Sequence, residues 1–151
     1  MNIQKVVQQG LRWLPSAVLA SGIEQPLNYV LRAERQRDAF AFLQQHWVQI
    51  DVSDYPLTFY VGYRPYNRRL HVSLAAQHAV ARMRSDSASM LAMMLQQVDP
   101  DTLFFQRKLL ITGDTEIALQ LKNLLDTVPL AERLPAPLLT WLQRTSQRPI
   151  P

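Results

Sequence analysis

The segment DPDTLFFQRKLLITGDTEIALQLKNLLDTVP, residues 99–129, carries the densest set of structural signals in the chain. Aspartate followed by proline predicts the start of a helix, because aspartate caps and proline fits the first helical position. A short turn then leads to an apolar strand over residues 108–112. Gly113 and Asp114 precede a second helix, in which Asp114 is the expected cap and Glu116 favours the positive end of the helix dipole.

Alternating apolar and polar residues precede this segment and are typical of half-buried strands. The alternation occurs over residues 48–52, 57–63, 70–74 and 79–83. The links between these runs are short, so the pattern predicts an antiparallel meander of the first three or all four strands.

Apolar residues at helical spacing predict further helices. The first twenty residues form one amphipathic helix by this criterion, and a second helical stretch begins after Pro26 and runs to Trp47. A third helix is expected over residues 88–98, with Ser85 or Ser87 as its cap. The order of helices and strands predicts an α+β domain with the helices on one face of a sheet.

Beyond residue 129, two prolines precede a last apolar segment that includes residues 138–142. The residues from 144 to 151 are expected to be disordered.

Composition excludes several classes of function. The chain has 151 residues, enough for one domain with its own core. It has no cysteine, which excludes disulfides and thiolate metal sites, and its four scattered glycines exclude a phosphate-binding loop. A net charge of +4 without a basic stripe argues against nucleic acid. The three histidines lack ligand spacing, so we expect no enzyme activity, no metal and no cofactor.

The N-terminal residues share some features with membrane-directed segments. No run of 18 apolar residues predicts a transmembrane helix, and polar residues interrupt the N-terminal stretch too often for a signal peptide. A cytoplasmic protein with peripheral contact at the inner membrane is therefore expected. The chain has no acidic residue before Glu24, and its membrane-contact candidates are Lys5, Arg12, Trp13 and Leu14. Docking of this helix on its own domain, or on a second copy, is the alternative.

Four of the five methionines lie close together, at Met83, Met90, Met93 and Met94. Methionine is flexible and polarisable, which suits a wall that adapts to an apolar guest. Filling of gaps in an ordinary core explains the same residues equally well. A hydrophobic pocket between the sheet and its helices is one expectation from this cluster.

The segment DPDTLFFQRKLLITGDTE, residues 99–116, resembles the C-terminal signature of the sterol carrier protein type 2 domain. The sequence DPDTLFFQR, followed by GDTEIALQLKNLLD, is similar to that of one branch of the superfamily, the UbiT (YhbT) family. The resemblance is dense over residues 97–128 and looser over 40–96, where FLQQHWVQIDV matches the entry into the first strand.

The resemblance implies a fold and a function that the residues alone do not. The fold would be a curved, mostly antiparallel sheet of about five strands, covered by helices and holding a hydrophobic tunnel. The function would be a non-catalytic accessory factor of oxygen-independent ubiquinone biosynthesis, with prenylated quinone precursors or phospholipids as ligands. UbiU- and UbiV-type hydroxylase proteins would be its partners, and a homo-oligomer would be compatible with the family.

The resemblance also divides the chain and suggests lipid-binding residues. Residues 26–130 would be the lipid-binding domain. The signature does not carry residues 1–25, expected from their spacing as the amphipathic N-terminal helix, or residues 131–151, expected as an apolar segment with a flexible tail. The lipid-binding candidates are Leu91, Met94, Leu95, Leu103, Phe104, Phe105, Leu109, Ile111, Ile117, Leu121 and Leu125. Two other functions stay open, a structural adaptor that assembles biosynthetic enzymes and a general phospholipid carrier.

Overall fold

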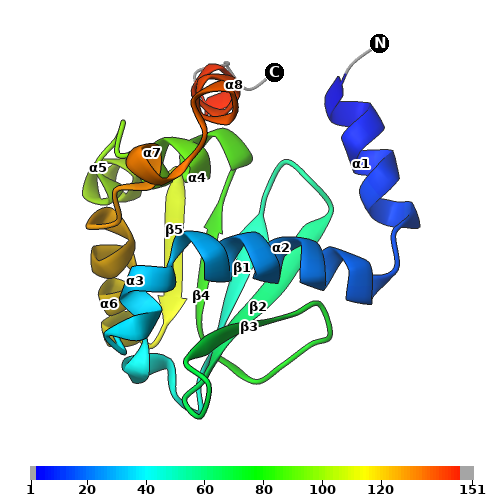
Figure 1. Ribbon diagram of the computed structural model, residues 1–151. Helices are drawn as coiled ribbons and strands as arrows, with labels where there is room; N and C mark the ends of the chain where they lie inside the picture. The colour runs from blue at the N-terminus through cyan, green and yellow to red at the C-terminus, as the bar shows by residue number, and fades with distance from the viewer. Residues whose placement is uncertain (1–2, 147–151) are drawn as a thin grey trace.

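The computed structural model describes residues 3–146 (Figure 1). The N-terminal half contains α1 (Ile3–Trp13), α2 (Ser16–Val30), α3 (Arg32–Gln36), the single 3-10 turn η1 (Ala41–Leu43), β1 (Trp47–Val52), β2 (Leu57–Arg64) and β3 (Arg69–Ser73). The C-terminal half contains β4 (Ala79–Ser85), α4 (Ser87–Met94), α5 (Pro100–Phe105), β5 (Leu109–Gly113), α6 (Thr115–Asp126), α7 (Leu130–Arg133) and α8 (Ala136–Ser146).

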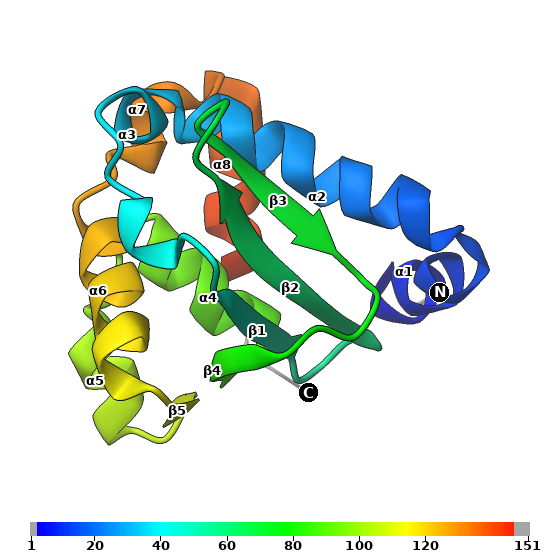
Figure 2. The ribbon, with the colours of Figure 1, turned by 90° about the horizontal axis from the view of Figure 1, so that it is seen from below.

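The five strands form one mixed sheet in the order β3-β2-β1-β4-β5. Three of the strand pairs are antiparallel, but β4 pairs with β1 in parallel. The expected meander is therefore confirmed for β1 to β3 and wrong for β4. The link over residues 74–78 joins β3 to β4, which lie three strand spacings apart, or about 14 Å. An extended link of this length spans roughly 17 Å, so it is long enough to cross that distance. It therefore runs past β2 and β1 instead of forming a hairpin (Figure 2).

The helix boundaries near the N-terminus differ from those expected. One helix over the first twenty residues is wrong, because α1 ends at Trp13 and α2 begins at Ser16 after Pro15; α2 then continues through Pro26, so a helix start after Pro26 is wrong as well. Proline inside a helix clashes with the carbonyl four residues earlier, which here belongs to Gly22. Gly22 and Pro26 are both exposed, so this turn of α2 faces solvent. The helical stretch also stops well before Trp47, because Asp38 has a positive φ of 60°.

Side-chain caps fix the N-terminal ends of helices α4 and α6. Asp86 caps α4, and its carboxylate accepts a hydrogen bond from the backbone N–H of Ser89 at 2.8 Å. The expected serine cap is wrong, since the Ser85 hydroxyl instead donates to the carbonyl of Lys108 at 2.6 Å. The cap expected at Asp114 is confirmed by hydrogen bonds from two backbone N–H groups of α6.

The helices gather on one face of the sheet, which confirms the α+β architecture (Figure 1). Helix α2 packs on the edge strand β3, α6 packs on β4 and β5, and α8 lies over α4. Within residues 3–146 no helix covers the opposite face (Figure 2). None of the helices in this range is long and apolar enough to cross a membrane. Residues 144–146 continue α8 instead of starting a disordered tail, and 147–151 lie outside the described residues.

The helix-free face of the sheet holds one buried carboxylate, that of Asp51 on β1. It accepts hydrogen bonds from Thr58 at 2.8 Å and Gln49 at 3.0 Å, and it forms an ion pair with Arg82. Burial opposes the charged form of Asp51, but these partners outweigh it and lower the pKa of the carboxyl. Asp51 therefore stays charged and ties β1 to β2 and β4.

Candidate functional site: an apolar cavity under helices α2 and α6

A cavity of about 130 Å³ lies between the inner face of the sheet and the helices that cover it. It is lined by Leu27, Leu31, Phe40, Ile50, Phe59, Val61, Leu70, Met83, Met90, Met93, Met94, Leu109, Leu121 and Leu125. Every lining residue is apolar, so the lining offers apolar contact and no group for acid–base or nucleophilic chemistry.

The strand register builds the floor of the cavity. Ile50 on β1 pairs with Phe59 on β2 and with Met83 on β4. Paired residues project from the same face of a sheet, so these three side chains lie together under the helices. The alternation seen in the sequence therefore produces a continuous apolar floor across the centre of the sheet.

Asn28 on α2 holds the roof over this floor. It is buried, and its side-chain amide donates to the carbonyl of Leu70 at 2.9 Å and accepts from the N–H of Leu70 at 2.8 Å. The side chain thus satisfies both backbone groups of one residue on the edge strand β3, as a further strand would. Leu27 and Leu31 flank Asn28 and line the cavity from above.

The methionine cluster forms much of one wall. Met90, Met93 and Met94 line the cavity from α4, and Met83 lines it from β4. Met83 and Met93 are buried and the other two are half-buried. The four methionines thus share one cavity, which fits an adaptable wall and is equally compatible with gap filling in a core.

The predicted lipid-binding residues divide by their place in the structure. Those that line the cavity are Met94, Leu109, Leu121 and Leu125. Those that are buried or half-buried but outside its lining are Leu91, Leu95, Leu103, Ile111 and Ile117. Phe104 and Phe105 lie on α5 with 47% and 81% of their surfaces exposed, so these two do not face the cavity. Proximity of large apolar residues to a strand was a poor guide to which face they occupy.

Half of the lining lies outside both the lipid-binding candidates and the methionine cluster. The seven are Leu27, Leu31, Phe40, Ile50, Phe59, Val61 and Leu70. All seven follow a pattern that the sequence does show, helical spacing for Leu27, Leu31 and Phe40 and alternation for the four strand residues. Pattern identifies inward-facing positions, but only the packed structure separates cavity lining from solid core.

The predicted membrane-contact residues all lie at the surface of α1 and the turn after it. They are Lys5, Arg12, Trp13 and Leu14. Trp13 is 87% exposed. Gln8 joins α1 to the rest of the chain, because its side-chain amide donates to the carbonyl of Asp54 at 2.7 Å.

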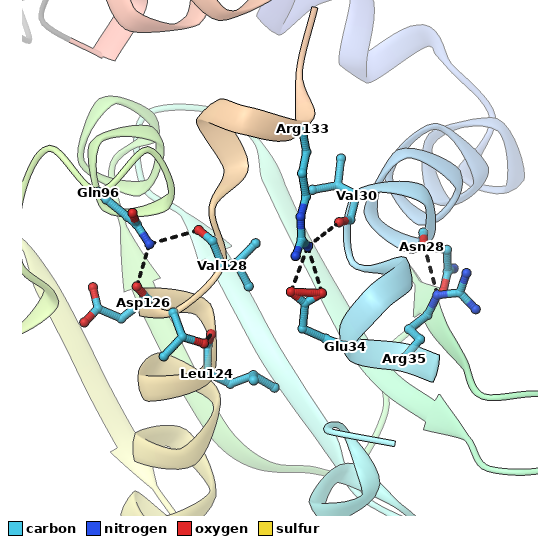
Figure 3. A network of polar contacts seen from close by, with 10 residues as sticks. Asn28, Val30, Glu34, Arg35, Gln96, Leu124, Asp126, Val128 and Arg133 are labelled. Carbon is cyan, nitrogen blue, oxygen red and sulfur yellow. Dashed lines mark hydrogen bonds and ion pairs between the residues drawn. The ribbon is translucent and has the colours of Figure 1, made fainter. Parts of the chain in front are cut away.

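A buried ion pair joins the end of α2 and α3 to the C-terminal helices (Figure 3). Arg133 on α7 lies 2.7 Å from a carboxylate oxygen of Glu34 and donates to the carbonyl of Val30 at 2.8 Å. Burial of Glu34 opposes its charge, but the hydrogen bond and the charge of Arg133 lower the pKa of the carboxyl.

Gln96, just after α4, forms a second link beside this pair (Figure 3). Its amide donates to the carbonyls of Asp126 and Val128 at 2.7 and 3.0 Å. The segments that carry both the helical roof and the methionine wall are thus anchored to the chain around α6 and α7.

Comparison with known proteins gives consistent results. Residues 27–126 match the family model described as the SCP-2 sterol transfer family. The chain is 37% identical over 121 residues to "Ubiquinone biosynthesis accessory factor UbiT" of Escherichia coli strain K12. The matched region covers 80% of this chain and 67% of that protein.

Two solved structures share the fold. The structure described as "UbiJ-SCP2 Ubiquinone synthesis protein" has a TM-score of 0.62 at 21% identity, covering 82% of this chain and 99% of that one. The sterol carrier protein domain 2 of Helicoverpa armigera has a TM-score of 0.51 at 14% identity, covering 67% of this chain and 82% of that one. At these identities the likeness concerns the fold alone.

Proposed function

We propose, from the premise that this chain belongs to the SCP-2 sterol transfer family, that it is a lipid-binding accessory factor of ubiquinone biosynthesis. The single observation that carries the proposal is the cavity, whose lining is entirely apolar. Such a site suits a prenyl or acyl chain, because each buried CH₂ contributes roughly 0.8 kcal/mol.

The size of the cavity limits how such a chain is held. At about 130 Å³ it is smaller than typical ligand pockets, which hold roughly 300–1,000 Å³. A long chain therefore requires the wall to move. The three methionines of α4 are the residues best suited to this, since methionine repacks at low cost.

The finer function follows the family resemblance. We propose that the ligand is a prenylated quinone precursor or a phospholipid, and that the protein serves an oxygen-independent route with UbiU- and UbiV-type hydroxylase proteins. The chain has no cysteine, so redox chemistry at iron–sulfur centres would belong to those partners. Residues 26–130 would bind the lipid, and α8 would support α4, which carries three methionines of the wall.

Residues 1–25 would bring the protein to the membrane. Trp13, Leu14 and Val18 are exposed, and the chain has no acidic residue before Glu24. An exposed aromatic and aliphatic surface with Lys5 and Arg12 suits an anionic lipid interface.

The test is native mass spectrometry with organic extraction of protein purified from cells grown without oxygen. A bound prenylated phenol supports direct handling of pathway intermediates, and phospholipid alone favours a general carrier. A clean mass without uptake of added lipid would refute lipid binding and leave the structural adaptor.

Two matched variants connect any bound lipid to the cavity. Leu125→Trp fills space in the lining, whereas Leu124→Trp adds the same volume at a neighbouring half-buried residue outside it. We expect loss of lipid in the first and retention in the second. Equal retention in both would place the lipid elsewhere.

A further inference from the structure

A concentration of arginines lies where α3 meets the turn between β2 and β3, at the opposite end of α2 from α1 (Figures 1 and 2). We call this surface the arginine corner. It consists of Arg32, Arg35, Arg37, Arg64, Arg68 and Arg69. These six residues come from two short segments, and they make up more than a third of the 16 basic residues of the chain.

Hydrogen bonds to neutral groups hold three of these guanidinium groups in place. Arg35 donates to the carbonyl of Arg68, and Arg68 donates back to the carbonyl of Gln36, both at 2.9 Å. Arg69 donates to the side chain of Gln25 on α2 at 3.3 Å. The corner is therefore ordered without any of its six arginines forming an ion pair within residues 3–146.

The carboxylates of the neighbouring segments are already engaged. Glu34 is buried against Arg133, Glu24 accepts from the backbone N–H of Val72 at 2.8 Å, and Asp38 accepts the hydroxyl hydrogen bond of Tyr63. Arg133 neutralises Glu34, whereas Glu24 and Asp38 keep their charge, so the six arginines still outnumber the carboxylates around them. Burial, followed by the charges of Arg69 and Arg32, lowers the pKa of Arg35.

The arrangement places like charges next to one another at a cost to the fold. Arg64 and Arg69 occupy directly paired positions in the β2–β3 ladder, where like charges are destabilising. An anionic partner that contacts the corner would relieve this repulsion, and the ordered guanidinium groups would lose little freedom on binding.

We propose that the arginine corner is a docking surface for a protein partner that presents clustered carboxylates. Segments 32–38 and 64–69 contain no lysine, tryptophan or branched aliphatic residue. The exposed aromatic residues are Tyr66, within the second segment, and Tyr29, shortly before the first. Arginine with tyrosine is the composition of protein interfaces, and the guanidinium fork matches a carboxylate. The corner lacks exposed tryptophan and aliphatic side chains such as Trp13 on α1 and Leu14 in the turn after it, which argues against a membrane here.

The test compares two variants that each remove three positive charges. Arg32→Gln/Arg37→Gln/Arg68→Gln changes the corner, and Arg84→Gln/Arg107→Gln/Arg144→Gln changes exposed arginines elsewhere. Binding of a fluorescein-labelled oligoglutamate peptide is measured by anisotropy at low salt, with an oligoglutamine peptide as the neutral control. Sedimentation with vesicles containing phosphatidylglycerol is measured in parallel.

We expect the corner variant to bind oligoglutamate about tenfold more weakly and the control variant to bind within about twofold of the native chain. Equal weakening in both variants would overturn the proposal, because net charge alone would explain the binding. Loss of vesicle binding in the corner variant with unchanged peptide binding would also overturn it and make the corner a membrane contact. The variant Arg32→Gln/Arg37→Gln leaves every hydrogen bond described above intact and serves if the triple variant folds poorly.

Discussion

The two ends of helix α2 are held to the protein in different ways. At the C-terminal end, Asn28 is hydrogen-bonded to Leu70 on the edge strand β3. Just beyond that end, Glu34 on α3 forms an ion pair with Arg133. The N-terminal end leads into α1, whose apolar residues Val6 and Val7 are more than 40% exposed. One helix therefore forms a rigid roof at one end and presents a surface arm at the other.

The sharpest test of the rigid end is Asn28→Ala. The N–H and carbonyl of Leu70 would lose their partners while remaining buried, so we expect the free energy of unfolding to fall by about 2–4 kcal/mol in urea titrations. Asn67→Ala is the control, since Asn67 accepts from a backbone N–H in an exposed turn. Equal losses in both variants would contradict the role given to Asn28.

Removal of Arg133 should have the next largest effect. In Arg133→Met the Glu34 carboxylate stays buried without its partner, which we expect to cost about 1–3 kcal/mol at pH 7. The figure is below that of a fully buried pair because Arg133 retains a quarter of its side-chain exposure.

The pH dependence of this loss gives a second measurement. The pKa of Glu34 is lowered in the native fold, so its contribution is present above its unfolded pKa and is lost as pH falls through the lower folded value. In Arg133→Met, burial raises that pKa instead. The stability difference between the two proteins should therefore shrink as pH falls from 7 toward 3, and a constant difference would contradict the ion-pair assignment.

Deletion of residues 1–14 tests the opposite end of the comparison. Because α1 leaves much of its apolar surface exposed, we expect the free energy of unfolding to change by less than about 1 kcal/mol. Binding to phosphatidylglycerol vesicles should be lost in the same variant. A large loss of stability would show that α1 is part of the core, and unchanged vesicle binding would refute its membrane role.

The smallest effect is expected at Gly22, on the exposed face of α2. A Cβ atom there meets nothing within 4 Å, so Gly22→Ala should raise the stability by about 0.5 kcal/mol in the same urea titration. Gly62→Ala is the contrasting variant, because its Cβ would lie 3.1 Å from the ring of Trp47 and should destabilise the chain. A loss at Gly22 would indicate that the turn before Pro26 requires glycine.

The sequence predicts much of this fold and less of the site. Alternation identifies the strands, and the cap at Asp114 identifies α6, because both signals are local. The parallel pairing of β4 with β1 depends on where a short link runs, which no local pattern encodes. The passage of α2 through Pro26 likewise runs against the local signal, because proline inside a helix removes a backbone hydrogen bond.

The candidate site shows the same division. Helical spacing places Leu121 and Leu125 correctly on the cavity, but Phe104 and Phe105 are as apolar and face solvent. The roles of Asn28 and Arg133 were not predicted at all. Each acts through a partner distant in sequence, such as Leu70 for Asn28.

The methionine wall has a spectroscopic consequence. The chain has five methionines, and all four that lie within residues 3–146 line the same cavity. Isotope labels placed on methionine methyl groups would therefore report almost exclusively on this one space. The methyl signals of Met83 on β4 and of the three methionines on α4 should therefore change when the cavity becomes occupied.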